Sequence, residues 1–405
     1  MKKAKLSQSN SLWHNRNYLL LWSGQTISSV GSGVSQIAFP LLVLMLTHSP
    51  AQAGLAGALR AAPYFIFTLP GGALIDRWNR KWVMILCDAG RALSLGSIPV
   101  AFVLGHLTIV QLYIVALLEG TLYVFFDLAE TASLPRVVSR EQLPAATAQN
   151  NVTFGITTLL GPPLGTVLYS VGRFLPFLAD AVSYTISVLS LFLMRVKFQE
   201  ERKAPRRKLY LEVSEGIKWL WHQPLLRSMA LLNCVMAGLG SGGTLLIIVL
   251  AQRQHTSTAF IGFIFSLGGI GAILGSLFAR PVQQHFSYGQ AIIAILWLYP
   301  LPYVLLAVAP TPLILGGLLA AGLLVDATYN VVQFSYRLAL IPDELQGRVS
   351  SSFRLISYSL RPLGQVLTGV LLQDIGPIFT ILAFSLCLVV LAVAASLNPH
   401  VRKAR

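Results

Sequence analysis

The stretch Gly72-Ala73-Leu74-Ile75-Asp76-Arg77-Trp78-Asn79-Arg80-Lys81 lies between two long, mostly apolar segments at residues 51–75 and 82–104. A hydrocarbon core of about 30 Å needs about 20 helical residues, so both segments are long enough to cross a bilayer. The few residues left for a turn carry one acidic and three basic side chains. Because short basic loops between membrane spans stay on the cytoplasmic side, this turn predicts the orientation of the whole chain.

The composition excludes an ordinary soluble enzyme. Hydrophobic residues make up 55% of the 405 residues and charged residues only 11%, whereas a soluble domain is about one-quarter charged. The net charge of +15 is also found in proteins that bind nucleic acid. Here, however, 24 of the 30 Lys and Arg residues fall in segments that the predicted spans place on one side. The charge therefore indicates the positive-inside pattern of a membrane protein, and we expect no nucleic-acid partner.

Twelve apolar runs follow one another along the chain, and the longest interruption divides them six and six. They cover residues 18–46, 51–75, 82–104, 108–131, 148–171, 174–195, 226–250, 257–279, 287–309, 312–335, 349–373 and 376–397. We predict an all-α membrane protein with twelve transmembrane helices in two pseudo-symmetric halves. An even number of spans places both termini on one side, in the cytoplasm. The predicted parts are a tail (1–17), an N-terminal half (18–195), a linker with an amphipathic helix along the inner leaflet (196–225), a C-terminal half (226–397) and a second tail (398–405).

The two halves carry related phrases in the same order. Gly72-Ala73-Leu74-Ile75-Asp76-Arg77 has a counterpart 203 positions later in Gly275-Ser276-Leu277-Phe278-Ala279-Arg280. Pro163-Leu164-Gly165 has one 199 positions later in Pro362-Leu363-Gly364. Repeated six-helix halves are typical of transporters whose substrate site lies between the halves.

These residues carry a family resemblance. The pattern Gly72-x-Leu74-Ile75-Asp76-Arg77-x-x-Arg80-Lys81 is similar to the loop 2–3 signature of the major facilitator superfamily. Other phrases resemble its branch of twelve-helix bacterial exporters, which includes macrolide-efflux and enterobactin-export proteins. The resemblance implies the major facilitator fold and a gating loop made by Gly72, Asp76, Arg77, Arg80 and Lys81. It also implies that Asp76 contacts the start of the eleventh helix when the cytoplasmic side is closed. The second copy departs from the pattern, because Ala279 stands where the first copy has Asp76.

In each of four predicted spans, polar side chains recur at helical spacing and so line one face of an otherwise apolar helix. Charged groups cost several kcal/mol in the membrane, so such stripes predict a shared water-filled cavity. Hydrogen bonding between neighbouring helices is the other explanation, and it stays open for the amides and hydroxyls. The stripes are Gln25, Ser29, Ser32 and Gln36; Glu119, Tyr123, Asp127 and Glu130; Asp326, Asn330, Gln333 and Arg337; and Arg354, Tyr358, Arg361 and Gln365.

From these stripes we predict a cavity site. Glu119, Asp127 and Asp326 are candidate proton carriers, because a desolvated carboxyl is readily protonated. Arg361 keeps its proton and would bind an anionic group of the substrate or a carboxylate. The predicted cavity residues are Gln36, Glu119, Tyr123, Asp127, Asp326, Asn330 and Arg361.

The fifth run holds a second motif. Gly161, Pro162 and Gly165 remove backbone donors and side-chain bulk in mid-helix. Two interpretations are equally open: a simple kink, or a functional bend that seals the cavity.

No catalytic triad, metal-binding cluster or phosphate-binding loop is evident, so we expect no enzyme, no metal and no cofactor. We predict a secondary active transporter of the bacterial inner membrane that works by alternating access. The family resemblance favours export of an amphipathic small molecule, either drug-like or a siderophore, by proton antiport. The expected partners are this substrate, the proton gradient and the lipid bilayer, with the chain as a monomer. A nutrient uptake permease, a lysophospholipid flippase and a non-transporting membrane scaffold are the alternatives.

Overall fold

The computed structural model describes residues 12–195, 209–342 and 345–404, and all secondary structure in these ranges is helical. The N-terminal part holds η1 (Leu12–His14), α1 (Arg16–Thr47), α2 (Pro50–Ile75), α3 (Arg80–Val103), α4 (Ile109–Val137), η2 (Arg140–Gln142), α5 (Leu143–Val171) and α6 (Leu175–Leu193). The C-terminal part holds α7 (Leu209–His222), α8 (Pro224–Ser241), α9 (Gly243–Arg253), α10 (Thr258–His285), α11 (Tyr288–Leu298), α12 (Pro300–Leu306), α13 (Pro312–Leu340), α14 (Gln346–Tyr358), α15 (Arg361–Asp374), α16 (Gly376–Leu397) and α17 (Pro399–Arg402).

Each of the twelve apolar runs forms a helix or a pair of consecutive helices. Eleven of them, within the described ranges, are long and apolar enough to cross a membrane. The remaining run forms α2, whose 26 residues correspond to about 39 Å of helix. The predicted all-α membrane fold is therefore confirmed.

Short polar caps start the helices that flank the tight turns. The Asn79 side chain accepts hydrogen bonds from the backbone N–H groups of Lys81 and Trp82, which have no partner inside α3. Ser49 caps α2 in the same way, and Pro50 follows it at a position where a helix loses no hydrogen bond to proline. The Asn79 cap starts α3 directly after the turn at 76–79, so α2 and α3 follow each other closely along the chain, while α2 packs on α4 and α3 packs on α6 and α4.

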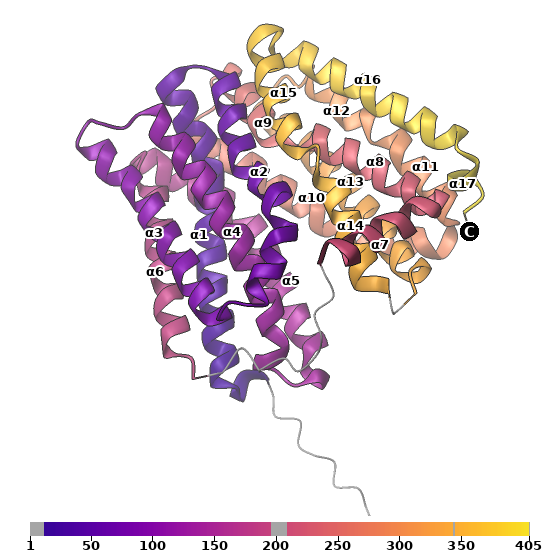
Figure 1. The fold of residues 1–405 in the computed structure, drawn as a ribbon. Helices are drawn as coiled ribbons and strands as arrows, with labels where there is room; N and C mark the ends of the chain where they lie inside the picture. The colour runs from indigo at the N-terminus through magenta and orange to yellow at the C-terminus, as the bar shows by residue number, and fades with distance from the viewer. Residues whose placement is uncertain (1–11, 196–208, 343–344, 405) are drawn as a thin grey trace, which may run out of the picture.

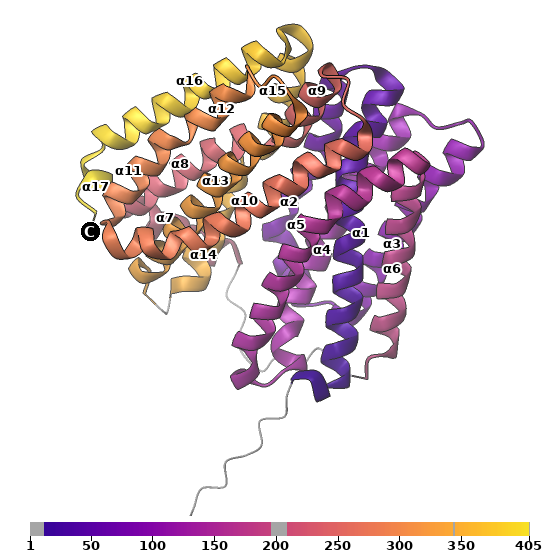
Figure 2. The same ribbon diagram turned by 180° about the vertical axis from the view of Figure 1, so that it is seen from behind.

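The six helices α1–α6 form one half of the molecule and α8–α16 form the other (Figure 1). Two helix pairs make the main contact between the halves, α2 with α15 and α5 with α10, and α1 and α2 also touch α9 and α14 more lightly. Figure 1 and the reverse view in Figure 2 show the halves meeting near the start of α2 and diverging toward the end that carries the turn at 76–79. We call these the closed end and the open end.

Glycines make the contact at the closed end possible. A Cβ atom on Gly369 of α15 would lie 2.6 Å from the Pro50 carbonyl oxygen, and one on Gly54 of α2 would lie 2.5 Å from the Gln365 carbonyl oxygen. Ser49 also donates a 2.5 Å hydrogen bond to the Gln373 side chain. Because larger residues at these glycines would collide with backbone, the close approach of α2 and α15 is built into the sequence.

The predicted amphipathic helix is present as α7, and it packs on the C-terminal half. Leu220 is fully buried, and Gly216 lies directly under the Arg348 carbonyl of α14. The Glu215 carboxylate accepts a 2.9 Å hydrogen bond from Arg348. These contacts hold α7 against the start of α14. Both lie at the open end of the molecule (Figure 1).

Candidate functional site

A buried charge network occupies the middle of the N-terminal half. The Glu119 carboxylate of α4 accepts a 2.8 Å hydrogen bond from Arg91 of α3 and another from Nε of Arg60 of α2. Glu119 and Arg91 are both 4% exposed. Removing one member of such a group would leave an unpaired buried charge, which is strongly destabilising. Glu119 is therefore a counter-ion for two guanidinium groups, a role that its place in the α4 stripe did not predict.

The network extends toward α6. Arg91 also approaches Asp88 at 3.8 Å, and its guanidinium carbon lies 4.1 Å from the centre of the Tyr184 ring. Asp88 accepts a 2.6 Å hydrogen bond from Ser187. The sequence offered one signal for this network: Arg60, Asp88 and Arg91 are charges within apolar runs, where an unpaired charge is costly.

Part of the α1 stripe turns out to serve helix packing. Gln25 donates a 3.0 Å hydrogen bond to Ser187, and the Ser32 hydroxyl lies 2.6 Å from the Tyr184 hydroxyl. Both partners belong to α6 of the same half. For these two positions the alternative explanation, hydrogen bonding between neighbouring helices, is correct. Gln36 is exposed.

Arginine and tyrosine side chains meet at the interface between the halves. Arg354 of α14 donates a 2.5 Å hydrogen bond to the Tyr64 hydroxyl of α2. The Tyr64 and Tyr358 rings lie edge to face with centroids 5.9 Å apart, and the Arg361 guanidinium lies 3.9 Å from the centre of the Tyr358 ring. Arg354 and Arg361 are both exposed. We call these four residues the interface cluster. Sequence reasoning missed Tyr64, although Arg60 and Thr68 lie four residues before and after it on the same face of α2.

Two carboxylates flank the interface cluster. Asp127 of α4 is half-buried, and the positive charge of Arg354 acts on it across the interface. Asp326 of α13 accepts a 2.8 Å hydrogen bond from the Tyr299 hydroxyl and a 3.0 Å bond from Asn330, and the charge of Arg361 acts on it.

Apart from Gln36, the predicted cavity residues fall into three sets. Asp127 and Tyr123 lie one turn apart on α4; Asp127 is half-buried and Tyr123 is 46% exposed. Asp326 and Asn330 are joined by a hydrogen bond within α13, and Arg361 lies at the start of α15 in the same half. Glu119 is enclosed in the charge network.

The turn at 76–79 is fastened to its own half. Arg80 donates a 2.7 Å hydrogen bond to the Ala132 carbonyl at the end of α4 and pairs with Asp76 at 3.3 Å. Lys81 donates a 2.7 Å hydrogen bond to the Met194 carbonyl after α6. Arg77 is exposed, and a Cβ atom on Gly72 would meet nothing within 4 Å.

The glycines of the fifth run bring two helices together. A Cβ atom on Gly161 would lie 2.9 Å from the Cα of Gly33, and one on Gly165 would lie 2.5 Å from the Val34 carbonyl oxygen of α1. Helix α5 continues without interruption through Pro162 and Pro163. Close packing on α1 thus accounts for both glycines, and a functional bend stays a prediction.

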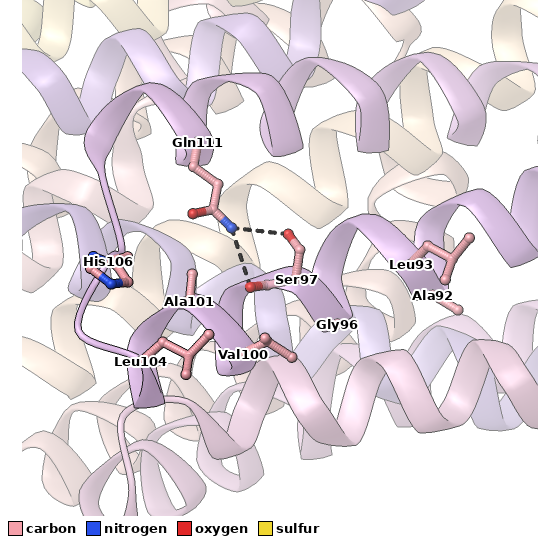
Figure 3. A pocket seen from close by; sticks show the side chains of 9 residues that line it. All are labelled: Ala92, Leu93, Gly96, Ser97, Val100, Ala101, Leu104, His106 and Gln111. Carbon is pink, nitrogen blue, oxygen red and sulfur yellow. Dashed lines mark hydrogen bonds between the residues drawn. The ribbon is translucent and has the colours of Figure 1, made fainter.

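Two hollows lie outside the interface cluster. Figure 3 shows the first, of about 540 Å³, on the outer side of α3 and α4, where Gln111 donates a hydrogen bond to Ser97 and the apolar Leu93 and Val100 are exposed. The second, of about 640 Å³, lies at the closed end between the halves and includes His48 and Gln252. Neither hollow contains a residue of the interface cluster.

Comparisons with known proteins agree with the fold and identify relatives. The Major Facilitator Superfamily pattern matches residues 21–365. The chain is 26% identical over 408 residues to the multidrug efflux pump Tap of Mycolicibacterium fortuitum, covering 95% of this chain and 96% of Tap. It is 25% identical over 347 residues to the enterobactin exporter EntS of Salmonella typhi, covering 85% of this chain and 82% of that protein.

Solved structures of a bacterial homologue of the iron transporter ferroportin share the fold. The inward-facing structure superposes with a TM-score of 0.74 at 16% identity and covers 95% of this chain and 99% of that one. The outward-facing structure gives a TM-score of 0.59 at 18% identity and covers 94% and 99%.

Proposed function

Because the chain belongs to the major facilitator superfamily, we propose that it exports an amphipathic small molecule, drug-like or a siderophore, by proton antiport. The protein is a multi-pass membrane transporter and not an enzyme. Two relatives that match along most of its length are exporters. The interface cluster is the observation that carries the proposal, because it combines cationic and aromatic surface at a contact between the halves.

The interface cluster fits a ligand that is both polar and apolar. Each of its two exposed guanidinium groups lies beside a tyrosine ring, so it can donate hydrogen bonds while the ring contacts apolar or aromatic surface. Asp127 and Asp326 add acceptors at the two edges. A bulky compound with several oxygen acceptors, such as a siderophore or a macrolide, satisfies both kinds of contact.

Substrate would also compete with the bond that joins the halves. The Arg354 hydrogen bond to Tyr64 crosses from α14 to α2, so a ligand that takes the guanidinium releases this contact. A ligand shifts a conformational equilibrium only through different affinities for its two states. A substrate that replaces the Arg354–Tyr64 bond would bind the two states with different affinities, which supports alternating access.

The orientation proposal follows from the basic turn. If the turn at 76–79 lies in the cytoplasm, the open end faces inward. The higher TM-score with the inward-facing ferroportin homologue supports the same conformation. A reporter fused after Arg405 should then report cytoplasm and one inserted near residues 252–256 should report the outside; the reverse result would overturn the orientation.

Export is tested in a bacterial strain that lacks its own efflux pumps. Expression of the chain should raise the inhibitory concentration of several macrolides, dyes or siderophores and lower their accumulation in cells. Arg354→Gln should abolish most of this protection at unchanged membrane abundance. The matched control is Arg402→Gln, which removes an exposed arginine of α17; it should leave protection unchanged.

Two outcomes contradict the export proposal, and a third contradicts the site assigned to it. Increased accumulation of a compound would indicate an uptake permease. Movement of a fluorescent lysophospholipid between leaflets of a reconstituted vesicle, with no small-molecule flux, would indicate a flippase. Equal protection by wild type and Arg354→Gln would remove the interface cluster from the site.

A further inference from the structure

Asp180 is a fully enclosed carboxyl that the interface site does not use. It lies in the second turn of α6 against α1, and it is 0% exposed. Its Oδ2 lies 2.5 Å from the Ser35 hydroxyl and its Oδ1 lies 3.2 Å from the Ser183 hydroxyl. Within the described ranges it makes no ion pair, whereas Asp88 and Glu119 both contact Arg91. The α1 backbone is shaped to admit it, because a Cβ atom on Gly31 would lie 2.7 Å from Asp180 Oδ1.

The hydrogens around Asp180 can be counted. A serine hydroxyl carries one hydrogen. The Ser35 hydroxyl lies within hydrogen-bond distance of the Ser32 carbonyl, and the Ser183 hydroxyl lies 2.7 Å from the Asp180 carbonyl. An ionised Asp180 would have to draw both hydrogens away from these carbonyls. A protonated Asp180 donates to Ser35, and both serines keep their carbonyl bonds. The protonated form therefore satisfies more of these buried groups.

The cost of a buried charge favours the same assignment. A carboxylate taken out of water without a cation in contact loses several kcal/mol of hydration. The charged groups that act on Asp180 are Arg91 of α3, Glu119 of α4 and Arg60 of α2. Both arginines bind Glu119, and within the described ranges neither lies at ion-pair distance from Asp180. Helix α1 contributes only serine hydroxyls at this site, and α6 contributes Ser183 and the neighbouring Tyr184.

Polar contacts connect Asp180 to the charge network inside the N-terminal half. The Ser35 hydroxyl donates to the Ser32 backbone carbonyl, the Ser32 hydroxyl contacts the Tyr184 hydroxyl, and the Tyr184 ring lies against Arg91. Two turns of α1 before Ser32, the Gln25 side chain donates a hydrogen bond to Ser187, which in turn donates one to Asp88. Ten residues of α1 separate Gln25 from Ser35, which corresponds to about 15 Å of helix. This row of polar contacts crosses about half the hydrocarbon core, away from the interface cluster.

We propose that Asp180 is a proton-binding site of the N-terminal half, separate from the substrate site, and that it is protonated in this conformation. On release, the proton passes from Oδ2 to a water molecule that must enter the site, and the Ser35 hydroxyl turns from the Ser32 carbonyl to the new carboxylate. The α1–α6 contact thus changes with each proton. The role of Asp180 in driving transport rests on the proposed export by proton antiport, and it replaces the prediction that Glu119 carries the proton.

Infrared spectroscopy tests the proton site without any substrate. The full chain in lipid nanodiscs, titrated from acidic to alkaline pH, should show a protonated-carboxyl stretch that persists at neutral pH. Asp180→Asn should remove this band, and the control Asp374→Asn, at an exposed carboxyl, should keep it. If Asp180→Asn does not fold, Ser35→Ala should shift the band in frequency, because it removes the acceptor of the proton. A wild-type band unchanged by these substitutions, or absent at neutral pH, would overturn the proposal.

Flux measurements then test the coupling role. In proteoliposomes loaded with a compound that the wild type exports, Asp180→Asn should lower the ratio of pH-driven to downhill flux at least tenfold. An unchanged ratio would remove Asp180 from coupling. A wild type that moves none of the tested compounds but shows the Asp180 band would refute the proposed export and leave the proton site intact.

Discussion

The two halves share a design but place their charged groups differently. In the N-terminal half, six uninterrupted helices enclose Arg91, Glu119 and Asp180 at 4% exposure or less. In the C-terminal half, three of the six spans are divided into two helices each, and Arg354 and Arg361 are exposed. Buried charges with several partners fix the helices around them, because each partner depends on the others. The N-terminal half is therefore the frame that buried charges hold together, and the C-terminal half presents exposed arginines that would contact the substrate in the proposed export.

Two of the three helix breaks in the C-terminal half supply hydrogen-bond partners to each other's backbone. The break after Ser241 lies beside the break before Arg361, and Gln365 donates a 2.7 Å hydrogen bond to the Ser241 carbonyl that the break frees. The Ser241 hydroxyl in turn lies 3.0 Å from the Arg361 carbonyl. Broken backbone at membrane depth is tolerated only where such partners exist. The exposed arginines of the interface cluster thus flank a pair of breaks, where small backbone changes can move them.

The largest expected effect comes from breaking the charge network. Arg91→Leu leaves Glu119 and Asp88 with fewer cations in a buried site, which should destabilise the folded protein by about 3–5 kcal/mol. We expect loss of monodisperse protein on extraction and a lower unfolding temperature in detergent. Arg361→Leu, the exposed counterpart in the other half, should retain the wild-type unfolding temperature. Equal behaviour of the two variants would refute the division into frame and contact surface.

The next effect concerns the closed end. Gly369→Leu inserts a side chain where a Cβ atom already lies 2.6 Å from the Pro50 carbonyl, and overpacking costs about 1–3 kcal/mol. This cost falls only on the conformation in which α2 and α15 touch. Spin labels at His48→Cys and Gln252→Cys, in a background without native cysteines, should move apart. Gly317→Leu is the control, because its Cβ meets nothing within 4 Å; a label distance that is the same in all variants would show that this contact does not hold the state.

A smaller effect is expected at the paired helix breaks. Gln365→Leu removes the donor to the Ser241 carbonyl, and a hydrogen bond of this kind contributes about 0.5–1.5 kcal/mol. The unfolding temperature should fall slightly, and hydrogen exchange around residues 238–242 should speed up. Gln252→Leu, at an exposed amide, should change neither. If exchange in this segment is unaffected, the two breaks do not support each other.

The smallest effect on stability is expected at the turn of the N-terminal half. Asp76 and Arg80 form an exposed pair, which contributes about 0–1 kcal/mol, so Asp76→Asn should leave the unfolding temperature unchanged. If Asp76 meets the start of α14 when the open end closes, the variant loses an anion at a helix N-terminus. Transport should then slow, and labelling of Asn330→Cys from the open end should increase. Unchanged transport together with unchanged labelling would mean that the turn is no latch.

Much of the fold could be predicted from the sequence. The twelve apolar runs coincide with helices, and the linker helix and the tight turn at 76–79 lie where composition placed them. These predictions succeeded because hydrocarbon thickness and helical repeat act locally on the chain. That Asp326, Asn330 and Arg361 share a cavity stays a prediction.

Tertiary structure alone decided what each polar residue does. Glu119 and Asp127 occupy one face of α4, yet Glu119 is enclosed by Arg60 and Arg91 while Asp127 remains open to the interface. Helical spacing fixes the face on which a side chain lies, but its partner can come from a helix hundreds of positions away, as Tyr64 and Arg354 show at a separation of 290. Whether a membrane carboxyl becomes a counter-ion or a proton site depends on whether those distant neighbours bring a cation, and only the packed fold determines that.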